Sequence, residues 1–214
     1  MPAPRSPAAA LSSLAWANVV FHLVGIGFAW IGMRPGSVAV PAAERLAYVA
    51  GRPAGWVWGW GVWMVCSLLL VAFMAVLRRR LPASSAADLA LILAASGMAV
   101  DLFCDGIQIQ ALPLAAAGGN RTLFFALERL AFTGGAAIAN GLYTASVMLM
   151  TLCLRTSRRS TRVLGWATGI SGAAMVVSGF LLSPALLLAS TGPTIGFYSL
   201  WTLRVARDLR QDRP

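Results

Sequence analysis

The sequence has no lysine, one histidine and few charged residues. Only 11% of its 214 residues are charged and 58% are hydrophobic, whereas soluble domains carry about 25% charged residues. Without a lysine amine, the chain can form neither a retinal or pyridoxal Schiff base nor a P-loop. The single histidine, His22, excludes a bis-histidine haem and a three-histidine zinc site within one chain. The composition therefore predicts an integral membrane protein and excludes a cytosolic enzyme domain.

Cysteine is scarce as well. Cys66, Cys104 and Cys153 lie inside apolar runs and form no CxxC pair. This pattern favours buried thiols over a disulfide framework or a thiolate metal site. We therefore expect no metal and no cofactor.

Positive charge is abundant by comparison, with a formal net charge of +10 at pH 7. Such a charge is also typical of nucleic-acid-binding proteins, but here the arginines lie in short clusters between apolar runs. We interpret the clusters as topological signals and as contacts with anionic lipid head groups. No nucleic-acid partner is expected.

Six apolar runs are each long enough to cross a bilayer core of about 30 Å, which needs about 20 helical residues. In lipid the backbone must satisfy its own hydrogen bonds, so these runs are predicted to be helices. The expected fold is an all-α polytopic membrane bundle of six transmembrane helices. It comprises an N-terminal tail (1–13), a membrane domain (14–203) and an arginine-rich C-terminal tail (204–214). The runs are 14–33, 56–77, 89–112, 134–154, 163–182 and 184–203.

Arginine placement predicts the orientation. With the N-terminus in the cytoplasm, twelve arginines lie inside and five outside, in agreement with the positive-inside rule. Both ends of the chain and both tails are then expected in the cytoplasm, and the expected location is the bacterial inner membrane. The inner set is Arg5, Arg78, Arg79, Arg80, Arg155, Arg158, Arg159, Arg162, Arg204, Arg207, Arg210 and Arg213, and the outer set is Arg34, Arg45, Arg52, Arg121 and Arg129.

Two outer segments are predicted to form short helices on the membrane surface. They are 41–50 (PAAERLAYVA) and 122–132 (TLFFALERLAF), and the second can continue directly into the fourth span.

The third apolar run contains an unusual polar stripe. Asp101, Asp105 and Gln108 are spaced i, i+4 and i+7, so they share one helix face. Each aspartate near the centre of a membrane helix costs about 2.5–3.5 kcal/mol to insert. The stripe is therefore expected to face the bundle interior or a wet cavity.

Polar residues of neighbouring spans fall at a similar predicted depth, and we expect them to join the stripe in one ligand or ion pocket. They are Asn18 and His22 of the first run and Asn140 and Tyr143 of the fourth, with Arg121, Glu128 and Arg129 around an outer mouth. Such a pocket suits a proton relay, cation binding or recognition of a polar head group. A purely structural role remains open, in which the acids only hydrogen-bond to neighbouring helices and hold them in register.

Small residues spaced four apart mark close helix packing. They pack either within the bundle, which we favour, or in a homodimer. They are Gly165, Gly169 and Ala173 in the fifth run and Ala137, Gly141 and Ala145 in the fourth.

The chain resembles a loosely defined family of bacterial six-span membrane proteins with no assigned function. The similar parts are the long first outer loop that ends in an aromatic helix start, the arginine-flanked third helix, and ANGLYTASVMLMTLCLR in the fourth. The resemblance implies an all-helical bundle and supplies no catalytic residue.

Three functions are open. The preferred one is a membrane protein that binds a small molecule, lipid head group, ion or proton at the acidic stripe. The second is a regulator or accessory subunit, anti-sigma-like, that docks a cytoplasmic partner through arginine-rich loops. The third is an enzyme acting on a lipid or isoprenoid, with Asp105 and either Glu128 or His22 as its acid–base pair. We consider a non-enzymatic role more consistent with the sequence, because it contains no nucleophile motif.

Overall fold

The computed structural model describes residues 7–154 and 158–211, and these residues are all-helical, without a strand. Five segments are long and apolar enough to cross a membrane, which is the make-up of a multi-pass membrane protein. The predicted all-α fold is thus confirmed. The five segments are Ala9–Gly36, Ala54–Arg78, Ser85–Ala117, Arg121–Cys153 and Arg159–Leu181.

Several of these segments join two or three elements end to end. The first consists of α1 (Pro7–Phe28), η1 (Ala29–Met33) and η2 (Arg34–Gly36), and the third of α4 (Ser85–Gly106), η3 (Ile107–Ala111) and α5 (Leu112–Ala117). The fourth consists of α6 (Arg121–Phe132), η4 (Thr133–Ala139) and α7 (Asn140–Cys153). The remaining helices are α2 (Ala42–Ala50), α3 (Ala54–Arg78), α8 (Arg159–Leu181) and α9 (Pro184–Gln211).

The spans differ from the predicted runs mainly in length. The third and fourth segments have 33 residues each, about 50 Å of helix, against about 30 Å of bilayer core. The predicted surface segment 122–132 is α6, and it continues into α7 as one helix. The sixth predicted run lies in α9, a helix of 28 residues that is outside the set of five.

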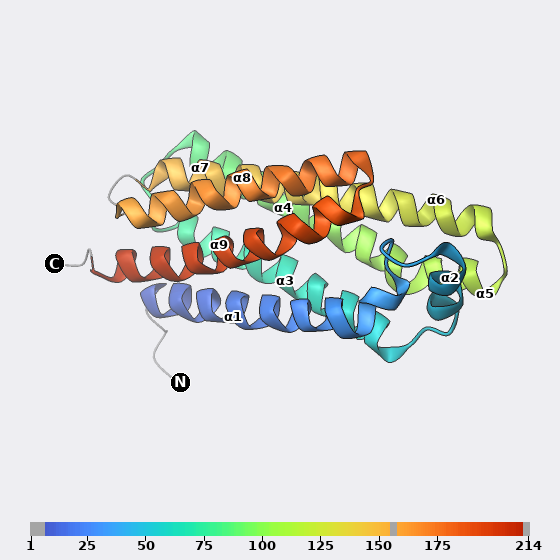
Figure 1. Ribbon diagram of the computed structural model, residues 1–214. Coiled ribbons are helices and arrows are strands. Elements are labelled where there is room, and N and C mark those ends of the chain that lie inside the picture. Colours follow the sequence, from blue (N-terminus) through green and yellow to red (C-terminus); the bar gives the residue numbers. More distant parts are fainter. Residues whose placement is uncertain (1–6, 155–157, 212–214) are drawn as a thin grey trace, which may run out of the picture.

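The long helices pack in a closed ring. The packed neighbours are α1–α3, α3–α4, α4–α7, α7–α8, α8–α9 and α9–α1. Each helix therefore packs against the next long helix in the sequence, and α9 closes the ring against α1. In Figure 1, α1 begins and α9 ends at the same end of the bundle, and α2 and α5 lie at the opposite end. Arg5, Arg155 and Arg213, which the orientation argument uses, lie outside the described residues.

Two apolar clusters fill the molecule. One contains Phe73, Met150 and Trp201 and occupies the part of the ring near the start of α1. The other contains Trp56 and Phe124 and joins α3 to the α2, α5 and α6 region. Val100, the residue before Asp101, packs against both clusters. The acidic stripe therefore begins where the two clusters meet.

Glycines of α8 let it pack closely on α7. A Cβ atom at Gly165 would collide with Thr151, and one at Gly169 would lie 2.6 Å from Cγ of Met148. This part of the small-residue face is thus used inside the chain.

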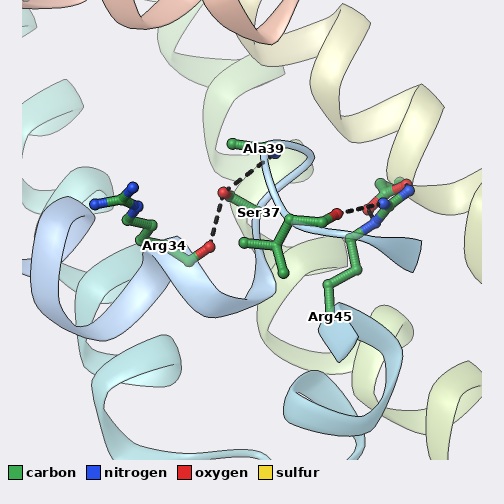
Figure 2. A network of polar contacts seen from close by, with 6 residues as sticks. Arg34, Ser37, Ala39 and Arg45 are labelled. Carbon is green, nitrogen blue, oxygen red and sulfur yellow. Dashed lines mark hydrogen bonds and ion pairs between the residues drawn. The ribbon is translucent and has the colours of Figure 1, made fainter. Parts of the chain in front are cut away.

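The α2 region is tied to the bundle by polar contacts. Arg45 donates to both carboxylate oxygens of Glu128 in α6, at 2.6 and 2.8 Å, and to the Val40 carbonyl at 2.9 Å. Figure 2 shows the adjoining turn, where the Ser37 hydroxyl donates to the Arg34 carbonyl and accepts from the Ala39 amide. These bonds hold α2 against α6 instead of leaving it as an isolated surface helix.

Tyr48 adds a second link from α2. Its hydroxyl donates to the Gly32 carbonyl of η1 at 2.5 Å. Partial burial raises the pKa of Tyr48 above its ordinary value, so the hydroxyl keeps the proton that it donates.

Candidate functional site

Asp101 connects three helices of the ring. Its Oδ2 accepts hydrogen bonds from Ser67 Oγ of α3 at 2.5 Å and from the Tyr143 hydroxyl of α7 at 3.3 Å. On the other side, a Cβ atom at Gly135 of η4 would lie 3.7 Å from Asp101 Oδ1. The carboxyl group therefore lies between α3, α7 and the π-helical segment that precedes α7.

Ser67 gives this contact two possible hydrogen-bonding states. Its Oγ lies 2.5 Å from Asp101 Oδ2 and 3.2 Å from the Trp63 carbonyl oxygen. A hydroxyl has one hydrogen, so it donates to only one of them at a time. If Asp101 carries a proton, it can donate to Ser67, and Ser67 can then donate to Trp63. The contact between Asp101 and Ser67 can therefore form in either protonation state of Asp101.

Asp105, one turn beyond Asp101, is buried and incompletely bonded. Its side chain is 2% exposed, and Oδ2 has no hydrogen-bond partner. Gln108 is 7% exposed, and its Oε1 also lacks a partner. Buried polar atoms are almost always paired, and an unpaired one costs about 1–3 kcal/mol. Two unpaired acceptors three residues apart therefore indicate a missing donor.

α3 presents its polar groups to this region. Trp56 Nε1 donates to the main-chain carbonyl of Gln108 at 2.8 Å. Trp60, one turn along α3, packs edge-on against Trp56 with ring centroids 5.7 Å apart, and its Nε1 is buried without a partner. Since η3 and η4 are π-helical, and such segments occur often at functional sites, the backbone around the acid pair is itself unusual.

Asn18 and His22 form a neighbouring cluster. Asn18 is fully buried; its amide nitrogen donates to the Leu69 carbonyl of α3 at 3.1 Å, and its Oδ1 accepts from the Tyr198 hydroxyl of α9 at 3.0 Å. His22 Nδ1 lies 2.7 Å from the Asn18 carbonyl oxygen. Because a carbonyl only accepts, Nδ1 carries the hydrogen. The cluster links α1, α3 and α9.

The two clusters meet along α3. The His22 ring packs edge-on against Trp63, with centroids 6.0 Å apart, and the Trp63 carbonyl oxygen lies within reach of Ser67. Among the described residues, His22 has no hydrogen bond or ion pair with Asp101 or Asp105. The structure thus brings the predicted polar residues of α1 close to the stripe through α3 rather than by direct contact.

The other predicted residues lie elsewhere. Asn140 donates to the Gly135 carbonyl of its own helical segment at 2.8 Å. Glu128 is paired with Arg45 in the α2–α6 contact, and Arg121 and Arg129 are exposed. The assignment of these three residues to a pocket mouth stays a prediction.

Sequence reasoning missed two residues of the interior, Ser67 and Tyr198. Ser67 is the one hydroxyl side chain in the run 56–77, a signal that was available. Tyr198 gave less signal, because aromatic residues are common in apolar runs. Their roles depend on which way each helix is rotated about its axis.

The structure also limits what the site can bind. No group of three or more His, Cys, Asp or Glu side chains in the described part of the chain could hold a metal ion. Among the described residues, the one titratable side chain that hydrogen-bonds to Asp101 is Tyr143, and none bonds to Asp105. No ion pair of the described residues includes either aspartate.

Fold and site together define an all-helical, multi-pass membrane protein with two acids one helical turn apart, of which Asp105 is buried and Asp101 is half-buried. Comparisons with protein-family models, with curated proteins and with solved structures return no match. What the chain does is argued below from its own geometry.

Proposed function

We propose that the chain is a six-span protein of the bacterial inner membrane that binds and releases a proton at Asp101 and Asp105. The observation that carries the proposal is the pair of buried acceptors without a donor, Asp105 Oδ2 and Gln108 Oε1, one and two turns from Asp101. One proton on the acid pair removes a buried charge and turns one acceptor into a donor. A single proton therefore both neutralises the buried charge and supplies the missing donor.

A proton fits the site better than a larger ligand. Two surface depressions among the described residues are lined by residues of α1, α8 and α9, and neither is lined by a residue of the acidic stripe. On the α3 side, Trp56 donates to the Gln108 carbonyl, and the ring of Trp60 packs against Trp56. A proton also agrees with the two hydrogen-bonding states of Ser67, since adding or removing it rearranges only one hydroxyl.

The topology that we propose has both ends of the chain in the cytoplasm, with α9 as the sixth span. α9 supports this because it packs along α8 and closes the ring against α1. The described arginine clusters at the end of α3, the start of α8 and the end of α9 lie at the end of the bundle where α1 begins. α2 and α6 then lie on the outer side, at or near the membrane surface. A fluorescent protein fused after residue 211 tests this, because it should fluoresce only from the cytoplasm.

Infrared difference spectroscopy on the protein in lipid vesicles tests the proton site directly. We expect a carboxylic acid C=O band that titrates with pH in the wild type. The band should lose intensity in Asp105→Asn and in Asp101→Asn. Asp88→Asn is the matched control, because Asp88 is on the same helix but is exposed and paired with Arg78 at 2.6 Å.

The outcomes separate the proposal from its competitors. A band that is absent at every pH from folded protein, or unchanged in both variants, contradicts proton binding. A band that titrates with Na⁺ at fixed pH, and not with pH at fixed Na⁺, identifies a cation site and also overturns the proposal.

The docking alternative has less support from the structure. Arg78 pairs with Asp88, and Arg158 lies 3.7 Å from Asp208. Two of the cytoplasmic arginines are thus engaged within the chain. The enzyme alternative loses Glu128 as a free acid, because Arg45 occupies both of its oxygens.

A further inference from the structure

A groove runs between α8 and α9 at the end of the bundle where α9 ends. It has a volume of about 540 Å³ and is lined by Arg159, Ser160, Val163, Leu164, Leu200 and Arg204. On each helix the arginine lies about one turn from the apolar residues, and the apolar residues lie toward the middle of the bundle. The groove is therefore polar at its outer end and apolar along its walls.

The two arginines of the groove stay unpaired within the part of the chain that the structure describes. No ion pair of the described residues includes Arg159 or Arg204. The nearby acid of α9, Asp208, is used elsewhere: its Oδ2 accepts from Thr161 Oγ1 at 2.7 Å and from the Arg158 amide at 3.2 Å. The groove thus presents two positive charges and one hydroxyl, and no carboxylate is among its lining residues.

The position of the groove indicates where its occupant comes from. Arg159 is the first residue of a helix that is long and apolar enough to span a membrane. Beyond the arginines, that helix exposes Val163 (57%) and Ile170 (73%), and α9 exposes Leu200 (52%). Charged groups at the start of a span, followed by exposed apolar side chains, match the boundary between lipid head groups and acyl chains.

We propose that this groove binds an anionic phospholipid. Arg159 and Arg204 hold the phosphate through charge-assisted hydrogen bonds, Ser160 donates a further one, and an acyl chain lies along Val163 and Leu200. Basic pockets between membrane helices on the cytoplasmic side bind anionic head groups in this way. The site is separate from the acid pair, so the proposal stands whether or not Asp101 and Asp105 bind a proton.

Native mass spectrometry of the full chain in detergent tests the proposal. The protein is titrated with phosphatidylglycerol or with phosphatidylcholine of the same acyl chains. We expect phosphatidylglycerol to bind at least about fivefold more tightly. Each arginine near an anionic head group contributes about fivefold in affinity, so Arg159→Gln with Arg204→Gln should weaken binding by up to about 25-fold.

The control is Arg79→Gln with Arg162→Gln, which removes the same charge from two exposed arginines outside the groove. It should bind phosphatidylglycerol within about twofold of the wild type. Arg159→Lys with Arg204→Lys keeps the charge and should retain most of the binding, which separates loss of the site from loss of the fold.

Three results would overturn the proposal. They are equal binding of the two lipids, an equal loss of binding in the control and in the groove variant, and displacement of the lipid by inorganic phosphate at the same concentration. The last result would identify a site for free phosphate rather than for a lipid.

Discussion

Tyr198→Phe removes one hydroxyl from the contact that closes the ring. In the wild type this hydroxyl donates to Asn18 Oδ1 at 3.0 Å, and the two residues are 4% and 0% exposed. The substitution keeps the ring that packs against Trp201 with centroids 6.2 Å apart. The change therefore isolates a hydrogen bond between the first and the last long helix.

The expected loss follows from where the bond lies. Hydrogen bonds between membrane helices contribute about 0.6 kcal/mol on average and up to about 1.7 kcal/mol. Among the described residues, Tyr198 is the donor that the buried Asn18 Oδ1 has from another helix, so we place Tyr198→Phe toward the upper part of this range, at about 1 kcal/mol. Asn18→Leu also loses the bond to Leu69 and should cost about 2 kcal/mol.

Unfolding in mixed micelles of increasing SDS content, followed by circular dichroism, measures both losses. The double variant should show a coupling energy of about 0.6 kcal/mol or more between Tyr198 and Asn18. Ser171→Ala is the control, since its hydroxyl bonds only to carbonyls of its own helix. A coupling energy of zero, or a Tyr198→Phe protein as stable as the wild type, would refute the claim that this bond joins α9 to α1.

Three further predictions concern other parts of the molecule. Gly32→Ala should destabilise the protein by about 1–3 kcal/mol, because the new Cβ would lie 2.8 Å from backbone atoms of α3, whereas Gly27→Ala, with open space at its Cβ, should be neutral in the same SDS titration. Asp208→Asn should weaken the cap of α8 by about 1 kcal/mol and speed amide hydrogen exchange in its first turn; unchanged exchange would contradict the capping role. Tyr48 has a raised pKa, so its bond to η1 should contribute fully below the ordinary tyrosine pKa of about 10 and be lost as the pH rises through the raised value. Absorbance titration against Tyr48→Phe measures this, and ionisation of Tyr48 at or below the ordinary value would contradict it.

Much of the helical architecture could be predicted from hydropathy. Runs of about 20 apolar residues locate the helices because lipid leaves the backbone no other way to pair its polar groups. The lengths of the third and fourth segments were underestimated. The third segment continues to Ala117 through the apolar residues 112–117, and the fourth begins with 121–132, which contains Arg121, Glu128 and Arg129; both parts lie beyond the thickness that the hydropathy criterion measures.

The interior site could be predicted only in part from the sequence. The spacing of Asp101, Asp105 and Gln108 places them on one face, and the cost of a charge in lipid points that face inward. Depth along the helix puts His22 at a similar predicted level, and its place in a shared pocket stays a prediction. Depth does not give the rotation of each helix about its axis, however. For that reason the bonds of Asp101 to Ser67, and of Asn18 to a tyrosine 180 residues away, needed coordinates.

The cyclic order of the helices has a consequence for biosynthesis. As the chain leaves the ribosome, each new long helix finds its partner in the helix inserted just before it, so most of the bundle can assemble from near neighbours. α1 is the exception, because one of its two flanks has no partner until α9 has been made. In a nascent chain, Asn18 Oδ1 therefore lacks its donor Tyr198 through most of synthesis. The ring of helices closes only when α9 is complete.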